Sequence, residues 1–143
     1  MTDPKKKIVH LHLPEENYQT IMHAGRHELI ADEPEALGGK DMGPDPYDYL
    51  LMALGSCSVI TMKMYAERKK WPLEDLYIEM RHYKKEVEET GATIKKDVIE
   101  KEITIAGNLD EKQTDRLIEI SKKCPVHRTL LGSVEIITSG NQK

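Results

Sequence analysis

The chain has 143 residues, of which 38% are hydrophobic and 32% are charged, and its formal net charge is −4. These values predict one soluble globular domain over residues 1–143, and the negative net charge argues against binding to nucleic acid or to an anionic membrane. The longest apolar run falls short of a membrane-spanning helix, and no signal peptide is recognised, so the expected localisation is cytoplasmic.

The N-terminal third of the chain predicts a small β-meander followed by a loop. Residues 5–14 alternate apolar and polar side chains, which is typical of a strand. Residues 18–25 and 27–34 are candidates for two further strands. The segment EALGGKDMGPDP, residues 35–46, is dense in glycine and proline and predicts a loop.

A long apolar helix is expected next. Asp45 suits the N-cap, Pro46 the first helical position and Asp48 the acidic position of a capping box, and the helix should run to about Lys70. It is apolar round most of its circumference, so we expect it to be buried on most sides. One small sheet cannot cover such a helix, and a homodimer that packs two of them together would bury both.

The remaining chain predicts alternating strands and helices. Residues 73–87 and 97–107 read as two strands joined by a charged hairpin connection around Gly91. A second helix is expected within residues 108–124, and the following PVHRTLL predicts a short helix closed by glycine. The segment SVEIIT, residues 133–138, predicts a last strand. This order places the chain in the α+β class.

The two cysteines, Cys57 and Cys124, lie in the middle of the long helix and at the end of the next one. From their positions alone, an inert buried pair and a redox pair both remain open. No metal site is expected, because the cysteines do not cluster with histidines and His10 and His12 lack further ligands. His127, when protonated, would lower the pKa of a nearby thiol, and otherwise it is an ordinary helix residue.

Three motifs give the chain a family resemblance. The sequence DEPEALGGKDMGPDP, then LLMALGSC, then CPVHRTL resembles the OsmC family, which contains osmotically inducible protein C and the organic hydroperoxide resistance proteins. The resemblance runs through nearly the whole chain. It implies an OsmC-like α+β fold assembled as an intertwined homodimer, with both active sites at the subunit interface and with no metal or organic cofactor.

The resemblance also implies a thiol peroxidase in which Cys57 matches the peroxidatic cysteine and Cys124 the resolving one. Cys57 would attack an organic hydroperoxide and become a sulfenic acid, and Cys124 would condense with it to form a disulfide. An external dithiol, such as a lipoylated protein, would then have to reduce that disulfide.

The chain departs from the family at the group that activates the thiolate. Burial raises the pKa of a thiol, and active family members offset this with an arginine held by a glutamate. The glutamate position, directly after the helix-opening proline, is Tyr47 here. Asp48 follows it, about 100° further round the helix, and already has a capping role. Arg26 and Arg128 are the candidate cations, and each is equally explained as a solvated side chain.

This departure predicts a slow peroxidase or one of altered specificity. Candidate residues for the substrate pocket are Tyr47, Leu54 and Thr61. The alternative function is a non-catalytic OsmC-like scaffold that binds an apolar ligand in the pocket at the dimer interface. In that case the two cysteines would be structural relics.

Overall fold

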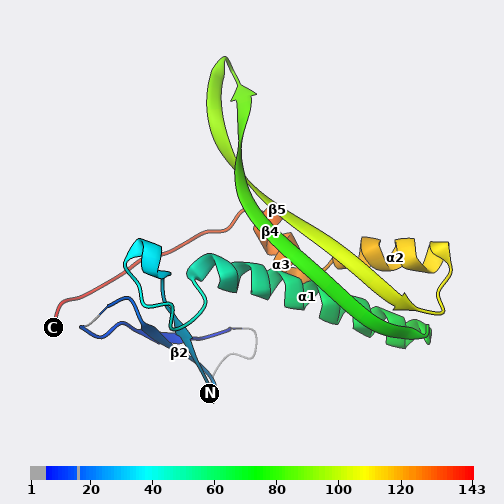
Figure 1. The fold of residues 1–143 in the computed structure, drawn as a ribbon, viewed down its shortest axis with the longest axis horizontal. Coiled ribbons are helices and arrows are strands. Elements are labelled where there is room, and N and C mark those ends of the chain that lie inside the picture. Colours follow the sequence, from blue (N-terminus) through cyan, green and yellow to red (C-terminus); the bar gives the residue numbers. More distant parts are fainter. Residues whose placement is uncertain (1–5, 16) are drawn as a thin grey trace. The chain divides into compact units, whose positions relative to one another are not determined.

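A computed structural model describes residues 6–15 and 17–143, and it divides the chain into two compact units (Figure 1). The first unit covers residues 1–50 and the second covers residues 51–143. The expectation of one domain over the whole chain therefore stays a prediction.

The first unit contains the predicted β-meander. Its strands are β1 (His10–His12), β2 (Thr20–Ala24) and β3 (His27–Ala31), which form an antiparallel sheet in the order β1-β2-β3. The register places Ile21 opposite Ile30. β1 is shorter than the sequence predicted, because only three of its residues pair with β2.

The glycine-rich loop that follows β3 is organised by one buried carboxylate. Asp32 is 2% exposed, and its carboxylate accepts backbone N–H hydrogen bonds from Glu33 at 2.7 Å, Lys40 at 3.2 Å and Met42 at 3.1 Å. Burial acts to raise the pKa of Asp32, but these three bonds outweigh it and lower the pKa. A Cβ at Gly39 would lie 1.9 Å from the Glu33 carbonyl oxygen, so this position requires glycine. The loop also contains a short 3₁₀ helix, η1 (Glu35–Leu37).

Helix α1 (Pro46–Lys69) begins and ends close to where the sequence predicts. The backbone N–H of Asp48 donates to Asp45 Oδ1 at 2.8 Å, and the N–H of Asp45 donates to Asp48 Oδ2 at 3.1 Å. This reciprocal pair confirms the predicted capping box. After the last helical residue, Lys70 adopts a left-handed conformation with φ of 59°.

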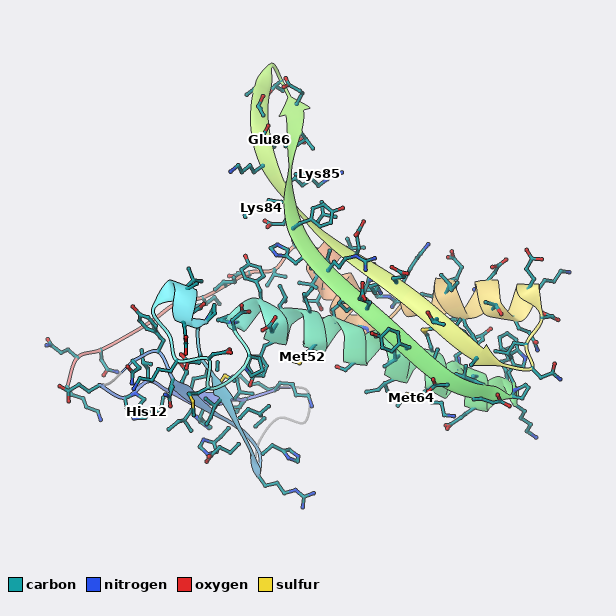
Figure 2. All side chains as sticks on the ribbon, in the orientation of Figure 1. His12, Met52, Met64, Lys84, Lys85 and Glu86 are labelled. Atoms are coloured by element: carbon teal, nitrogen blue, oxygen red, sulfur yellow. The ribbon has the colours of Figure 1, made fainter. Side chains whose placement is uncertain are left out.

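The surface of α1 corrects one expectation from the sequence, and a single chain does not meet a second. By length and composition alone α1 is apolar enough to cross a membrane, contrary to the expectation that no segment reaches that length. The core helix of a soluble protein passes the same test. The helix was also expected to be buried on most sides, yet only 28% of its most apolar window is buried within this chain. Met52 and Met64 are 47% and 63% exposed (Figure 2).

The second unit is built on a long antiparallel hairpin of β4 (Leu73–Glu89) and β5 (Ala92–Gly107). Its turn is tight, with Glu89 opposite Ala92, so most of the predicted connection is strand instead. Two helices follow, α2 (Glu111–Ser121) and α3 (Pro125–Leu131). Residues of α1, α2 and the start of β4 share the buried core: Met62, Tyr65, Ala66, Leu73, Leu117 and Ile120.

The predicted last strand is wrong in the described structure. Residues 133–138 form neither strand nor helix, and Val134, Ile136 and Ile137 are 57%, 83% and 83% exposed. A strand exists only when its backbone groups pair with another strand, and no edge within the second unit pairs with this segment.

Candidate functional site

The second unit brings α1 close to the sheet at the turn of helix that carries Cys57. Gly55 is buried, and a Cβ at this position would lie 3.2 Å from Cγ of Met80 on β4. The absence of a side chain therefore lets the helix backbone approach the strand. Cys57 and Ser58 follow directly on the same helix, with Cys57 half-buried and Ser58 fully buried.

The second cysteine lies next to Ser58 and Cys57. Cys124 is the N-cap residue of α3 and is fully buried. Its Sγ lies 3.4 Å from Ser58 Oγ, and its side chain also interacts with that of Cys57. Both cysteines are free thiols. Two cysteines that are 67 residues apart in the sequence thus share one site.

The cation of this cluster is Lys101, which lies on β5. Its ammonium donates hydrogen bonds to Ser58 Oγ and to the Ser121 carbonyl oxygen, each at 2.9 Å. The Ser58 hydroxyl is in turn 3.4 Å from the sulfur of Cys124 and 3.4 Å from the Ser121 carbonyl. The arrangement can supply both positive charge and hydrogen bonds to a thiolate.

The groups around Cys124 lower the pKa of its thiol. Burial acts to raise the pKa of Cys124, but the Ser58 hydroxyl, the backbone N–H of His127, the side chain of Cys57 and the charge of Lys101 lower it below its ordinary value. The pKa of Lys101 is also lowered, mainly by burial, although the two cysteines act to raise it.

His127 does not supply the charge that the sequence left open. Burial first, and then the positive charges of Lys101 and Lys122, lower the pKa of its imidazole. The ring is therefore neutral at physiological pH. Its Nδ1 is buried and has no hydrogen-bond partner among the described residues. What reaches Cys124 from this residue is the backbone N–H.

The remaining candidates lie elsewhere or have other roles. Asp48 forms the capping box of α1. Arg128 is exposed on α3, and Arg26 is exposed in the turn between β2 and β3 of the first unit. Arg128 is not among the main groups that shift the pKa of Cys124. Their proposed roles stay predictions.

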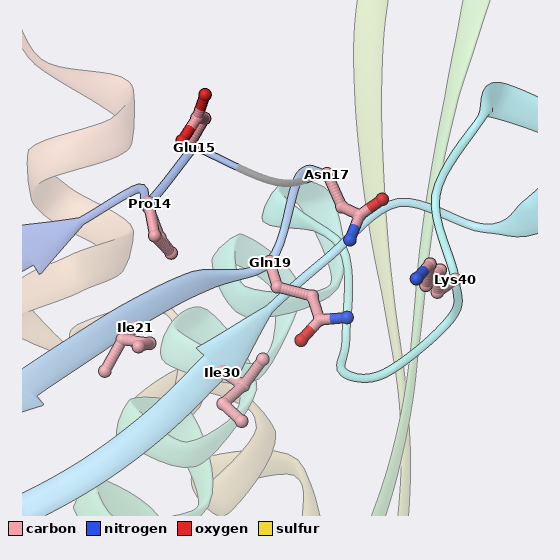
Figure 3. Close-up of a pocket in the computed structure, with 7 residues that line it drawn as sticks. All are labelled: Pro14, Glu15, Asn17, Gln19, Ile21, Ile30 and Lys40. Atoms are coloured by element: carbon pink, nitrogen blue, oxygen red, sulfur yellow. The ribbon is translucent and has the colours of Figure 1, made fainter.

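The three pocket candidates differ in their surroundings. Leu54 is 4% exposed, Tyr47 is 51% exposed, and Thr61 Oγ1 donates to the backbone carbonyl of Cys57 at 2.7 Å. A hollow of ≈ 490 Å³ in the first unit is lined by none of them; Ile21, Ile30 and Lys40 are among its lining residues (Figure 3). This hollow contains neither cysteine.

A family model matches most of the chain. The family model described as OsmC-like protein matches residues 38–139. The chain belongs to the OsmC-like protein family. No curated protein matches the chain.

Solved structures of OsmC-like proteins share the fold of this chain. The OsmC-like protein of Mycoplasma pneumoniae is 22% identical, with a TM-score of 0.73 over 91% of this chain and 90% of its own. The organic hydroperoxide resistance protein OsmC of Legionella pneumophila, described as a predicted redox protein, is 20% identical, with a TM-score of 0.66 over 92% and 93%. An organic hydroperoxide resistance protein of Elizabethkingia anophelis is 16% identical, with a TM-score of 0.67 over 94% of both chains.

Sequence reasoning about this OsmC-like chain missed Lys101 and Ser58. A signal for Lys101 was present, because it interrupts a strand face otherwise made of Ile99, Ile103 and Ile105. A charged side chain on the covered face of a strand needs a partner. Ser58 gave no comparable signal, since a serine in an apolar helix commonly bonds only to its own backbone.

Proposed function

We propose that this OsmC-like protein is a thiol peroxidase that reduces organic hydroperoxides with Cys57 and Cys124. The observation that carries the proposal is the meeting of both free thiols, from separate helices, beside the ammonium of Lys101. The names of the Legionella and Elizabethkingia neighbours, which refer to organic hydroperoxide resistance, agree with this chemistry. Membership of the family supports a redox function of the same kind.

The exposure of the two thiols supports their division of roles. Cys57 is half-buried and so is the sulfur that a substrate can reach, whereas Cys124 is fully buried in the chain. The Cys57 thiolate attacks the distal oxygen of the hydroperoxide, the O–O bond breaks, and the alkoxide leaves and takes up a proton. Cys57 is then a sulfenic acid.

The second half of the cycle uses Cys124. Its thiolate attacks the sulfur of Cys57, the S–S bond forms, and the departing hydroxide is protonated to water. A dithiol of the lipoyl class then attacks the disulfide through a mixed disulfide, and both cysteines return to the reduced state. The electrons come from that dithiol, so the proposal includes no metal or organic cofactor.

The proposal includes a low rate or an altered specificity. Tyr47 lies in the first turn of α1. The resemblance implies that active members of the family have a glutamate at this position. Lys101 takes over the supply of positive charge, but a lysine is a point charge that lacks the planar, bidentate geometry of arginine. We expect weaker positioning of the peroxide than an arginine would give.

Assembly as a homodimer is part of the proposal. Within one chain, α1 leaves Met52, Ile60 and Met64 exposed, and the C-terminal segment leaves Ile136 and Ile137 exposed. Large apolar side chains that are exposed in a single chain can mark an interaction surface. A second copy of the chain would bury it.

Intact mass after treatment with tert-butyl hydroperoxide tests the proposed chemistry. The reduced wild-type protein should lose two hydrogens as an intrachain disulfide forms. Cys124→Ser should instead gain one oxygen at Cys57 that dimedone traps, and Cys57→Ser should be unchanged at the same peroxide concentration. Intact thiols in the wild type would contradict the proposal. They would favour the non-catalytic scaffold, whose test is an apolar ligand that co-purifies.

A further inference from the structure

The further inference concerns Lys101 and Ser58, and it deepens the proposed function on which it rests. We infer that Lys101, acting through the hydroxyl of Ser58, holds Cys124 as a thiolate and so prepares it to resolve the sulfenic acid on Cys57. Lys101 and Ser58 are positioning residues in this account. Neither is assigned contact with the hydroperoxide.

The distances indicate where the single proton of the Ser58 hydroxyl points. Its two acceptors, the Cys124 sulfur and the Ser121 carbonyl oxygen, are both 3.4 Å away. This distance is ordinary for a hydrogen bond to sulfur but long for one between two oxygens. The Ser121 carbonyl already accepts from Lys101 at 2.9 Å. We therefore assign the Ser58 proton to the contact with Cys124.

The charge of Lys101 has few other partners. No carboxylate of the second unit, residues 51–143, forms an ion pair with it, and its two hydrogen bonds go to neutral oxygens. A half-buried ammonium without a counter-ion is costly, and a thiolate at Cys124 would offset that cost. The geometry is thus a chain of hydrogen-bond donors that runs from the Lys101 ammonium through the Ser58 hydroxyl to the Cys124 sulfur. We call this chain the relay.

Other groups around Cys124 act in the same site. They are the Cys57 side chain from α1 and the His127 backbone from α3. Lys122 acts on Lys101 and on His127, and its own ammonium is paired with Glu119 at 3.1 Å. The neutral His127 ring adds no charge. Lys101 is therefore the cation whose removal should affect Cys124 most.

The relay has a chemical consequence at two steps. When Cys124 attacks the sulfenic sulfur, it is already deprotonated, so the S–S bond forms without a prior proton transfer. When an external dithiol thiolate attacks Cys57 in the disulfide, the S–S bond electrons leave with Cys124. A stabilised thiolate is the better leaving group in that step.

The test measures the thiolate of Cys124 directly, in a Cys57→Ser background where Cys124 is the sole cysteine. Absorbance at 240 nm is followed against pH, with the variant lacking both cysteines subtracted to remove the tyrosines. Lys101→Met and Ser58→Ala should each raise the titration midpoint. At pH values below the parent midpoint, the thiolate fraction should fall by roughly tenfold, which corresponds to about one pH unit.

Two controls separate the relay from a structural effect. Lys101→Arg retains the charge and should restore the parent midpoint. Lys96→Met removes the same charge from the same strand, roughly 17 Å away along β5, and should leave the midpoint unchanged. Lys96 is exposed and stands opposite Lys85. Figure 2 shows Lys85 on the outer part of the hairpin. Ser58→Ala changes the side-chain volume only slightly. It therefore tests the relay even if the Lys101→Met variant does not fold.

The outcomes distinguish this inference from the peroxidase proposal. Midpoints of Lys101→Met and Ser58→Ala that equal that of Lys96→Met would overturn the relay, as would a parent that titrates like free cysteine. A low parent midpoint in a protein that consumes no hydroperoxide would refute the peroxidase and support the relay. In the presence of both cysteines, Lys101→Met should also accumulate more dimedone-trapped Cys57 after oxidation, because resolution is slower.

Discussion

The ammonium of Lys101 lies 2.9 Å from the hydroxyl oxygen of Ser58, a contact between residues 43 apart in the sequence. It joins the strand that ends the β4–β5 hairpin to the helix turn that carries Cys57. It brings positive charge next to Cys57 and Cys124. The hairpin register, with Lys101 opposite Met80, places that charge on the side of the sheet where α1 packs.

Gly39→Ala should destabilise the first unit strongly. The added Cβ would lie 1.9 Å from the Glu33 carbonyl oxygen and 2.9 Å from Asp32 Oδ1, so the loop must move. We expect a loss of roughly 2 kcal/mol or more in the free energy of unfolding, measured by urea denaturation. Gly140→Ala is the matched control, because no atom lies within 4 Å of its added Cβ. Equal stability of the two variants would refute a steric role for Gly39.

Asp32→Asn should reveal a pH-dependent contribution to stability. The pKa of the Asp32 carboxyl is lower in the folded chain than its ordinary value of 3.8, so the unfolded chain binds more protons at acid pH. The stability from ionised Asp32 is fully present above pH 3.8 and is lost as the pH falls through the lowered pKa. The difference in unfolding free energy between wild type and Asp32→Asn should therefore be constant from pH 7 to about 5 and shrink below about 4. A difference that stays constant down to pH 2.5 would contradict this account.

Charges in the C-terminal segment should break the proposed dimer. Ile136→Glu combined with Ile137→Glu places two carboxylates on side chains that are 83% exposed in the single chain and that a second copy is proposed to cover. Light scattering should show the mass of a dimer for wild type and of a monomer for the double variant. Gln142→Glu adds charge in the same segment and should stay dimeric. A monomeric wild type at micromolar concentration would refute the dimer.

Local signals in the sequence predicted the elements that depend on local interactions. The cap of α1 was predictable because Asp45 and Asp48 satisfy each other's backbone N–H groups within one turn. The prediction of a last strand was wrong because Val134 and Ile136 can form a strand only beside the edge of another strand. No local sequence pattern reports whether such an edge is present. The sequence did not predict the cation of the site for a related reason. Strand register and helix packing, which are both non-local, decide that Lys101 meets Ser58.

The most direct test of the central claim is the rate at which reduced protein reacts with tert-butyl hydroperoxide, measured by stopped flow against free cysteine at the same pH. The account predicts that wild type reacts at least about 100-fold faster than free cysteine, the order that positioned charges and hydrogen-bond donors supply, and that Cys57→Ser loses this reaction. A wild-type rate equal to that of free cysteine would contradict the peroxidase function.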